Sequence, residues 1–339
     1  MSRKVFNYAG ISTIEIRGPP NLLERIADNM EGETGNSLIS NCTININQSE
    51  SLFKIEKDKR FDYLTINKTG TVEQPFIIYT RYDTHVRTIH QKSPNDYEVN
   101  ANVARDEASG LICIRNHLST HPELTQYPLL HASLLNLDGR GILIPGSSRQ
   151  GKTTLAVYLL QEHGAAFVSD ENVILDINGE NVRGLYVPRT PRVRFSTIVE
   201  SGLSKVLQDI RIANATQYID SDAIERIIEA RSFNVDAGIV FSRRVFCNLL
   251  GTDSKESSPV NMVLFPKYKE GGNLNVRELG LEEGIQRLSK TGLARKSDID
   301  PKELQETIIN LESYKFVGVN FIEVEFSGVE NLRQGGFRL

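Results

Sequence analysis

Eight consecutive residues, Gly146 to Thr153, have the types and spacing needed to hold the phosphates of a nucleotide. They read GSSRQGKT and match the pattern G-x-x-x-x-G-K-[ST] in full. Glycines let the backbone bend so that successive N–H groups face the phosphates, and the N-terminal end of a following helix adds positive charge. Lys152 would neutralise the β- and γ-phosphates, and the Thr153 hydroxyl would bind Mg²⁺. The residues predicted to contact the nucleotide, which we take to be ATP, are Gly146, Ser147, Ser148, Arg149, Gln150, Gly151, Lys152, Thr153 and Thr154.

Two adjacent acids, Asp170 and Glu171, follow this loop after one expected helix and one expected strand, AAFVS. An acid at the end of that strand would point towards the γ-phosphate. One acid would hold Mg²⁺ while the other accepts the proton of an attacking hydroxyl group. We therefore predict a metal site made of Thr153, Asp170 and Glu171. The alternative is a solvated turn before the run VILDI.

Three arginines, Arg189, Arg192 and Arg194, alternate with prolines and apolar residues further along the chain. A guanidinium group binds phosphate in a bidentate manner, so these side chains are candidates for clamping the transferred phosphate or an anionic substrate. A solvated strand face explains the same alternation equally well.

The elements that must position these residues begin after Pro128. The apolar runs LLHASLLNL and GILIPG are separated by DGRG, which predicts a strand hairpin. The second run leads into the GSSRQGKT loop, an apolar-periodic helix over about 151–162 and the strand AAFVS. This order of strand, loop, helix and strand is the beginning of a nucleotide-binding α/β core.

Later segments complete the expected catalytic domain. Helical patterns in LSKVLQDI and DAIERIIEA, between Ser201 and Ala230, suggest an insertion or a lid. The run NMVLFP predicts a strand, LEEGIQRLSK and PKELQETIINLES predict helices, and FVGVNFIEVEF predicts a final pair of strands.

The N-terminal part predicts a smaller, mostly antiparallel α+β domain. Its strand-like runs are TIEIRG, CTININQ, LFKIEKD, FDYLTINKTG and FIIYTRY, and a helix is expected over NLLERIADNM, which follows Pro20. The polar segment 85–106 is expected to be a loop or linker. We therefore divide the chain into residues 1–125, a β-rich accessory or substrate-recognition domain, and residues 126–339, the catalytic domain.

Composition excludes several other classes of function. The formal net charge is -4 with acids and bases mixed along all 339 residues, so no basic tract predicts a nucleic-acid partner. No run approaches the roughly 20 apolar residues that cross a membrane, and the start MSRKVFNYAG lacks the apolar core of a signal peptide, so we expect a cytoplasmic protein. Three distant cysteines, Cys42, Cys113 and Cys247, offer no zinc or redox pair.

The run LLHASLLNLDGRGILIPGSSRQGKTTLAVYLLQEHGAAFVSDENVIL resembles the catalytic core of the HPr kinase/phosphorylase family. That family includes HPr kinase-like enzymes of lasso-peptide clusters and belongs to the P-loop branch related to phosphoenolpyruvate carboxykinase. The resemblance extends over roughly residues 128–290, including VPRTPRVRF and MVLFPKYKEGGNLNVREL. It departs at Arg149, where the family usually has glycine, and at Glu171, where aspartate is commoner. The C-terminal signature of the bifunctional HPr enzymes is missing, so the kinase-like relatives are the better match.

The resemblance implies roles for individual residues. His131 falls at the family's histidine before the loop, and Asp170 at the first of its paired acids, which is associated with proton transfer to and from the acceptor hydroxyl. Glu171 would help to place the metal. A single histidine in an apolar run is usually a hydrogen-bonded core residue, but this position favours a group near the acceptor or γ-phosphate that tunes Asp170. We thus predict Asp170, Lys152 and His131 as the catalytic residues.

The predicted reaction is Mg²⁺-dependent transfer of the γ-phosphoryl group of ATP to a hydroxyl group of a peptide, protein or small metabolite. Family members often assemble into rings, which raises the expectation of a homo-oligomer. Two alternatives stay open. One is a P-loop ATPase that acts as a conformational switch. Against it, the chain has no transporter-type LSGGQ run, and the only segment that resembles the motif N-K-x-[DE], Asn67–Gly70, lacks the acidic residue. The other is a nucleotide-binding scaffold without turnover.

Overall fold

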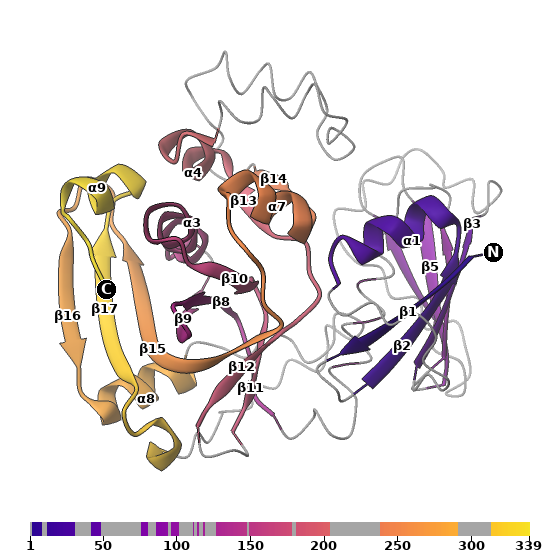
Figure 1. The fold of residues 1–339 in the computed structure, drawn as a ribbon, viewed down its shortest axis with the longest axis horizontal. Coiled ribbons are helices and arrows are strands. Elements are labelled where there is room, and N and C mark those ends of the chain that lie inside the picture. Colours follow the sequence, from indigo (N-terminus) through magenta and orange to yellow (C-terminus); the bar gives the residue numbers. More distant parts are fainter. Residues whose placement is uncertain are drawn as a thin grey trace. The chain divides into compact units, whose positions relative to one another are not determined.

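The computed structural model describes residues 2–8, 12–30, 42–48, 76–80, 86–93, 96–101, Leu111, Ile114, Leu118, 127–147, 149–177, 181–203, 238–290 and 313–339. The chain divides into two compact units, and the division falls between Gln126 and Tyr127. Each unit is a mixed α/β structure and is described by itself (Figure 1). The role of the first unit in substrate recognition stays a prediction.

The first unit contains a six-stranded sheet in the order β1-β2-β3-β6-β5-β4. Strand β3 runs parallel to β2 and β6, and the remaining pairs are antiparallel. Helix α1 lies where the sequence predicted a helix, and its apolar stripe of Leu22, Leu23 and Ile26 is buried. The bounds are β1 (Ser2–Tyr8), β2 (Ser12–Gly18), α1 (Pro20–Ala27), β3 (Cys42–Gln48), β4 (Phe76–Thr80), β5 (Val86–Ser93) and β6 (Asp96–Ala101).

The prediction of a loop over residues 85–106 is wrong, because β5 and β6 occupy most of this segment. In β6, Tyr97 and Val99 are fully buried and alternate with polar residues. A strand of a one-sided sheet needs apolar side chains only at every second position, so two large residues are enough here. The expected strands LFKIEKD and FDYLTINKTG lie outside the described residues.

The second unit is built on a nine-stranded sheet. Its main path is β10-β8-β9-β15-β12-β11-β7, with β17 attached to β15 and β16 attached to β17. Its strands are β7 (Leu129–Leu130), β8 (Ala132–Leu137), β9 (Arg140–Pro145), β10 (Ala166–Ser169), β11 (Val173–Asp176), β12 (Arg183–Tyr186), β15 (Ser257–Tyr268), β16 (Asn275–Leu279) and β17 (Asn320–Phe326), beside a separate pair β13 (Arg192–Arg194) and β14 (Gly238–Val240). Its helices are α3 (Lys152–His163), α4 (Phe195–Glu200), α7 (Arg243–Leu250), α8 (Leu281–Lys290), the 3₁₀ turn η2 (Ser313–Phe316) and α9 (Val329–Gln334).

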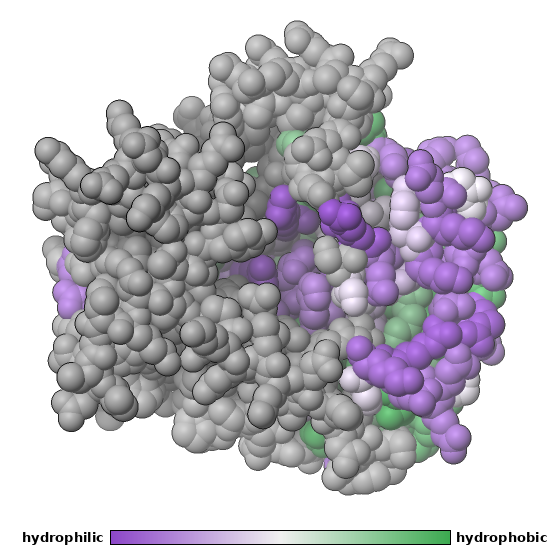
Figure 2. All heavy atoms as spheres, turned by 180° about the vertical axis from the view of Figure 1, so that it is seen from behind, coloured by the Kyte–Doolittle hydropathy of each residue, from purple (hydrophilic) through white to green (hydrophobic). Residues whose placement is uncertain are grey.

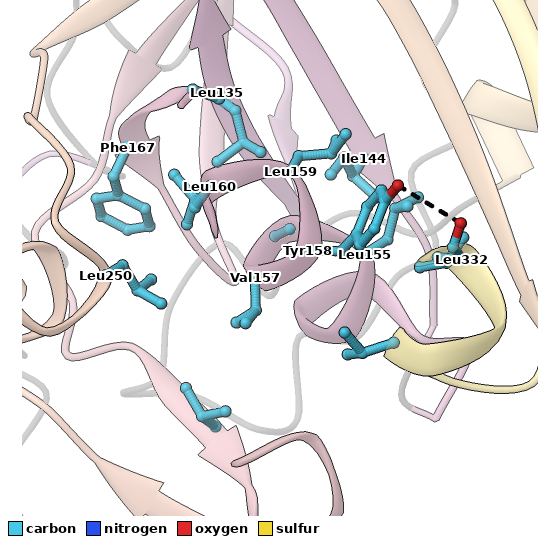
Figure 3. Close-up of a cluster of buried hydrophobic side chains, with 14 of the residues drawn as sticks. Leu135, Ile144, Leu155, Val157, Tyr158, Leu159, Leu160, Phe167, Leu250 and Leu332 are labelled. Carbon is cyan, nitrogen blue, oxygen red and sulfur yellow. Dashed lines mark hydrogen bonds between the residues drawn. The ribbon is translucent and has the colours of Figure 1, made fainter. Parts of the chain in front are cut away.

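The hairpin predicted at DGRG is confirmed. Asp138 and Gly139 have φ of 50° and 86°, the two positive values that a tight turn between β8 and β9 requires. Helix α3 begins at Lys152, so it includes the last two residues of the GSSRQGKT sequence, and it packs on one face of the sheet. Figure 3 shows its side chains Leu155, Leu159 and Leu160 beside residues of β8 and β9.

Helix α8 confirms the prediction over LEEGIQRLSK, and its Leu288 belongs to a second apolar cluster with Phe265 and Phe321. This cluster differs from the one around α3, so the sheet is covered on both faces. Charged side chains of β16, β17 and α8 form ion pairs at the outer end of this sheet, where Figure 2 shows mainly hydrophilic residues.

The predicted final strand pair is wrong. The segment FVGVNFIEVEF contains the end of η2 and the single strand β17, separated by a turn with Gly318 at φ 85°, and α9 follows. The partners of β17 are β15, in parallel, and β16, both from earlier in the chain. Apart from Leu203 and Ser313, the expected helices LSKVLQDI, DAIERIIEA and PKELQETIINLES lie outside the described residues.

Two of the three cysteines, Cys42 and Cys247, are buried free thiols, and Cys113 is not among the described residues. Within the described ranges, no helix is both long enough and apolar enough to span a membrane.

Candidate active site

The GSSRQGKT loop and the acidic pair, Asp170 and Glu171, lie at the same edge of the sheet. Strand β8 lies between β9 and β10 and is antiparallel to both, so β9 and β10 run in the same direction. The loop follows the end of β9 and Asp170 follows the end of β10. Ligands of open α/β sheets bind at this kind of edge, which makes it the candidate active site.

Two residues of the GSSRQGKT loop have left-handed backbone conformations. Arg149 and Gly151 have φ of 71° and 93°, so the chain turns sharply twice before α3 begins at Lys152. No side chain caps α3 at Gly151 within the described part of the chain. The first N–H groups of a helix have no partner inside the helix and attract anions. The family usually has glycine where Arg149 stands, and this left-handed φ explains why glycine suits the position.

Other loop residues lie as follows. Ser147, Arg149 and Gln150 are exposed, and Ser148 is outside the described residues. The Gln150 amide oxygen accepts a hydrogen bond from the Ser147 N–H at 2.7 Å, in the manner expected of a phosphate oxygen. Thr153 is half-buried in the first turn of α3, whereas the Thr154 hydroxyl bonds to the Thr197 hydroxyl of α4 at 2.8 Å. The Thr154 side chain therefore already has a partner within the protein, which leaves its backbone N–H for the predicted nucleotide contact.

His131 links Lys152 to the acidic pair. Its Nε2 lies 3.1 Å from Lys152 Nζ and 2.9 Å from Glu171 Oε2. His131 and Glu171 are each a little more than one quarter exposed, whereas Lys152 and Asp170 are buried. The structure thus brings together the three residues predicted to be catalytic, together with Glu171.

Sequence reasoning missed Ser133, which holds Asp170. The fully buried Ser133 hydroxyl donates to Asp170 Oδ1 at 2.5 Å. The other carboxylate oxygen, Oδ2, is buried and has no hydrogen-bond partner among the described residues. One signal was available: His131 and Ser133 are two positions apart in a strand-like run, so their side chains lie on one face of the sheet.

The two neighbouring acids have opposite electrostatic properties. Burial raises the pKa of Asp170, and the charge of Glu171 raises it further, against the opposing effects of Ser133, Lys152 and Arg189. Burial would also raise the pKa of Glu171, but the hydrogen bond with His131 and the charges of Arg189 and Lys152 outweigh it and bring that pKa to about 2. Asp170 is therefore suited to exchange a proton, and Glu171 stays a carboxylate.

Burial lowers the pKa of Lys152, and Arg189 and Arg194 act in the same direction. The charges of Glu171 and Asp170 oppose this effect. The Lys152 ammonium group therefore sits in a site that gains from added negative charge, such as a phosphate.

Of the three arginines predicted to contact substrate, the structure brings two to this site. Arg189 acts electrostatically on Asp170, Glu171 and Lys152, and its Nη1 donates to the Asn172 side-chain oxygen at 3.0 Å when that amide is oriented to satisfy its neighbours. Arg194 acts on Lys152. Arg192 is exposed at the start of β13, in keeping with a solvated strand face.

The described residues contain no cluster of three or more His, Cys, Asp or Glu side chains that would hold a metal by itself. Mg²⁺ does not require one, because it keeps several waters and binds one or two carboxylates together with phosphate oxygens. Thr153, Asp170 and Glu171 supply one hydroxyl and two carboxylates, and the buried Asp170 Oδ2 is without a hydrogen bond in the described structure. The donor set therefore fits Mg²⁺ accompanied by a nucleotide.

No family model matches the chain. The chain is 23% identical over 185 residues to HPr kinase/phosphorylase of Malacoplasma penetrans (strain HF-2). This match confirms the resemblance predicted from the sequence. The chain is therefore similar to an HPr kinase/phosphorylase over about half of its length. The alignment covers 55% of this chain and 59% of the relative, so this chain spans less than two thirds of that protein.

The chain is also similar to a solved structure, the Hpr(Ser) kinase/phosphatase from Coxiella burnetii. The TM-score is 0.26 and the sequence identity 16%, with 61% of this chain and 94% of the other covered.

Proposed function

We propose that the chain transfers the γ-phosphoryl group of ATP to a hydroxyl group. One observation carries this proposal: Asp170 is a buried carboxylate, fixed on one oxygen by Ser133 and without a hydrogen-bond partner on the other in the described structure, at the edge where the GSSRQGKT loop opens. A general base for an alcohol needs such an oxygen, because the proton must have an acceptor within hydrogen-bond reach.

In the proposed reaction, the acceptor oxygen forms a bond to the γ-phosphorus while the bond from that phosphorus to the bridging oxygen of ADP breaks. The hydroxyl proton passes to Asp170 Oδ2. The raised pKa of Asp170 makes its carboxylate a stronger base than an ordinary aspartate. Glu171, with a pKa of about 2, does not compete for that proton. Two carboxylates with pKa values pushed apart by their surroundings commonly divide the acid–base and electrostatic roles in this way.

Lys152 would neutralise the charge that develops on the transferred phosphoryl group, from its buried position beside His131. His131 contacts Lys152 and Glu171 through the same ring nitrogen, Nε2. That nitrogen donates to Glu171 when it carries a proton and accepts from Lys152 when it does not. His131 would therefore orient either Glu171 or Lys152 towards the phosphates, depending on whether Nε2 carries a proton.

Thr153 and Glu171 would hold Mg²⁺, which leaves Asp170 Oδ2, the carboxylate oxygen that is not bonded to Ser133, to accept the hydroxyl proton. The ion would neutralise phosphate oxygens and favour departure of ADP. Arg189 and Arg194 would add positive charge on the same side of the site as Lys152.

The test is transfer of γ-³²P from labelled ATP with Mg²⁺ to a panel of hydroxyl acceptors. The names of the two similar proteins refer to HPr and, in one, to Ser, so the panel includes HPr along with peptides and small alcohols. We expect acid-stable label in one acceptor. Asp170→Asn should reduce the rate by about 10²- to 10⁴-fold, the usual contribution of a general base.

Asp176→Asn is the matched control, because Asp176 is a half-buried aspartate at the end of β11 that was not predicted to belong to the site. Equal rates for wild type and Asp170→Asn would refute the assignment of the base. Release of free phosphate at a rate independent of any acceptor would favour a conformational ATPase. Binding of ATP without turnover would favour a scaffold.

A further inference from the structure

If ATP binds as proposed above, the order of strands indicates on which side of the loop its nucleoside half would lie. Strands β8 and β10 are on one side of β9, whereas β15, with β17 attached, is on the other. Figure 1 shows β15 and β17 on one side of α3 and β10 on the other. In the proposed reaction the γ-phosphate faces Asp170, after β10. The rest of the nucleotide therefore extends from the loop towards the ends of β15 and β17.

Tyr268 is the last residue of β15 and contacts the GSSRQGKT loop directly. Its backbone N–H donates to the Gln150 carbonyl oxygen at 3.1 Å. Leu264 of the same strand packs in the cluster around α3, and side chains four positions apart lie on the same face of a strand. The Tyr268 ring is thus on the α3 face of the sheet, at the edge where the phosphates would bind.

Phe326 supports the Tyr268 ring on one edge. Tyr268 is the register partner of Phe326 in β17, and the two rings meet edge to face with centroids 6.2 Å apart and planes at 87°. Phe326 is fully buried and lies against Gly151, where an added Cβ would be 2.7 Å from its Cζ. Tyr268 itself stays 44% exposed. The loop is therefore flanked by an aromatic ring that is supported on one edge and open to solvent.

The charges around Tyr268 favour an uncharged group over another phosphate. Lys267 and Lys269 alternate to the opposite side of the strand, where they pair with Glu325 at 2.6 and 3.4 Å. Burial, and then the charges of Glu200 and Glu270, raise the pKa of the Tyr268 hydroxyl. The surroundings of the ring are thus acidic, which disfavours an anion and tolerates a neutral heterocycle.

We propose that Tyr268 is the platform on which the base of the bound nucleoside triphosphate stacks. This inference rests on the proposed function of the same site. Stacking uses the π-face that every base has, so Tyr268 contributes affinity and does not choose between adenine and guanine.

The test compares two ligands by titration calorimetry on the full chain with Mg²⁺: ATP, and inorganic tripolyphosphate, which has no base. Loss of one stacking contact should raise the Kd of ATP about tenfold for Tyr268→Ala. The Kd of tripolyphosphate should not change, and Tyr268→Phe should resemble wild type for both ligands. GTP should weaken by the same factor as ATP.

Tyr268→Leu serves as a second variant, since it keeps apolar volume on Phe326 without a π-face, and should behave as Tyr268→Ala does. Val276→Ala, at an exposed apolar residue of β16, is the matched control and should change neither ligand. Equal effects of Tyr268→Ala on ATP and tripolyphosphate, or no effect on either, would overturn the platform.

This outcome is separable from the proposed function, because the titration needs no acceptor. A chain that binds ATP through Tyr268 but transfers no phosphate would contradict the kinase and leave the platform standing. A wild-type chain that binds ATP no more tightly than tripolyphosphate would overturn the platform, whether or not it transfers phosphate.

Discussion

The contact between Gly151 and Phe326 allows a quantitative prediction about the loop. Gly151 has φ 93° and is the N-cap of α3, and Gly164, with φ 66°, is the C-cap of the same helix. An added Cβ at Gly151 would lie 2.7 Å from Phe326 Cζ, whereas one at Gly164 would meet no atom within 4 Å. The two glycines therefore differ mainly in whether a methyl group has room.

Alanine at either position adopts a left-handed conformation, which costs about 1–2 kcal/mol. Alanine also reduces the conformational entropy of the unfolded chain, which stabilises the folded state by roughly 0.4–1 kcal/mol. The unfolded-chain term is similar in the two variants and cancels, and the backbone term is at least as large at Gly151, whose φ of 93° lies outside the usual left-handed range. What remains is the overpacking at Phe326, about 1–3 kcal/mol, because this ring is fully buried and cannot swing into solvent.

We therefore expect Gly151→Ala to be less stable than Gly164→Ala by about 2 kcal/mol, a difference of roughly 4–8 °C in Tm for a unit of this size. Differential scanning calorimetry measures this difference. Gly151→Ala should also weaken ATP binding, since relief of the clash moves the backbone that faces the phosphates, while Gly164→Ala should bind ATP as wild type does.

The partner in the clash can be tested by a second substitution. Phe326→Leu removes the ring atoms that the methyl group would meet, so Gly151→Ala should cost less in the Phe326→Leu background than alone. Equal Tm values for the two glycine variants, or full additivity in the double variant, would refute the claim that Phe326 limits the space under the loop.

Three further predictions concern the acids and the arginine. Ser133 lowers the pKa of Asp170, and the reaction needs Asp170 deprotonated, so Ser133→Ala should move the acidic limb of the pH–rate profile to higher pH. Ser258→Ala, at another buried serine, is the control and should leave the acidic limb in place. A shift of the limb to lower pH in Ser133→Ala would contradict the role of Ser133. Glu171→Gln should raise the Mg²⁺ concentration for half-maximal rate by about tenfold or more, and an unchanged Mg²⁺ titration would remove Glu171 from the metal site. Arg189→Ala should lower kcat/KM by roughly 10²-fold, as loss of one charge-stabilising donor does, whereas a wild-type value would place Arg189 outside the reaction.

The centre of the site was predictable because its signals are local. The GSSRQGKT loop, the hairpin before it and the helix after it depend on residues close together in the sequence. The approach of Asp170 to the loop follows from the direction of two strands that flank one helix, a short-range rule of α/β structure.

The remainder depends on contacts between distant segments. The bond from Ser133 to Asp170 spans 37 positions, and Phe326 reaches Gly151 from the last strand of the sheet. Strand β6 was missed because its two buried residues, Tyr97 and Val99, give too few apolar positions to stand out from a polar loop. The residue pattern of a short stretch of sequence does not predict which distant strand will pair with it.

The proposed division of roles between Asp170 and Glu171 depends on one uncommon backbone conformation. Adjacent acids would ordinarily share one environment, yet Glu171 has φ 66°, an uncommon value for a residue other than glycine. This turn leaves Asp170 in the buried layer with Ser133 and directs the longer Glu171 side chain to His131, in a more exposed position. The two carboxylates therefore differ in burial and in hydrogen-bond partner, the two factors that separate their pKa values. Aspartate, commoner in the family at the second position, adopts a left-handed φ more readily but has one methylene less with which to reach the histidine. Glutamate here accepts the backbone strain and keeps the contact with His131, and through His131 it stays connected to Lys152.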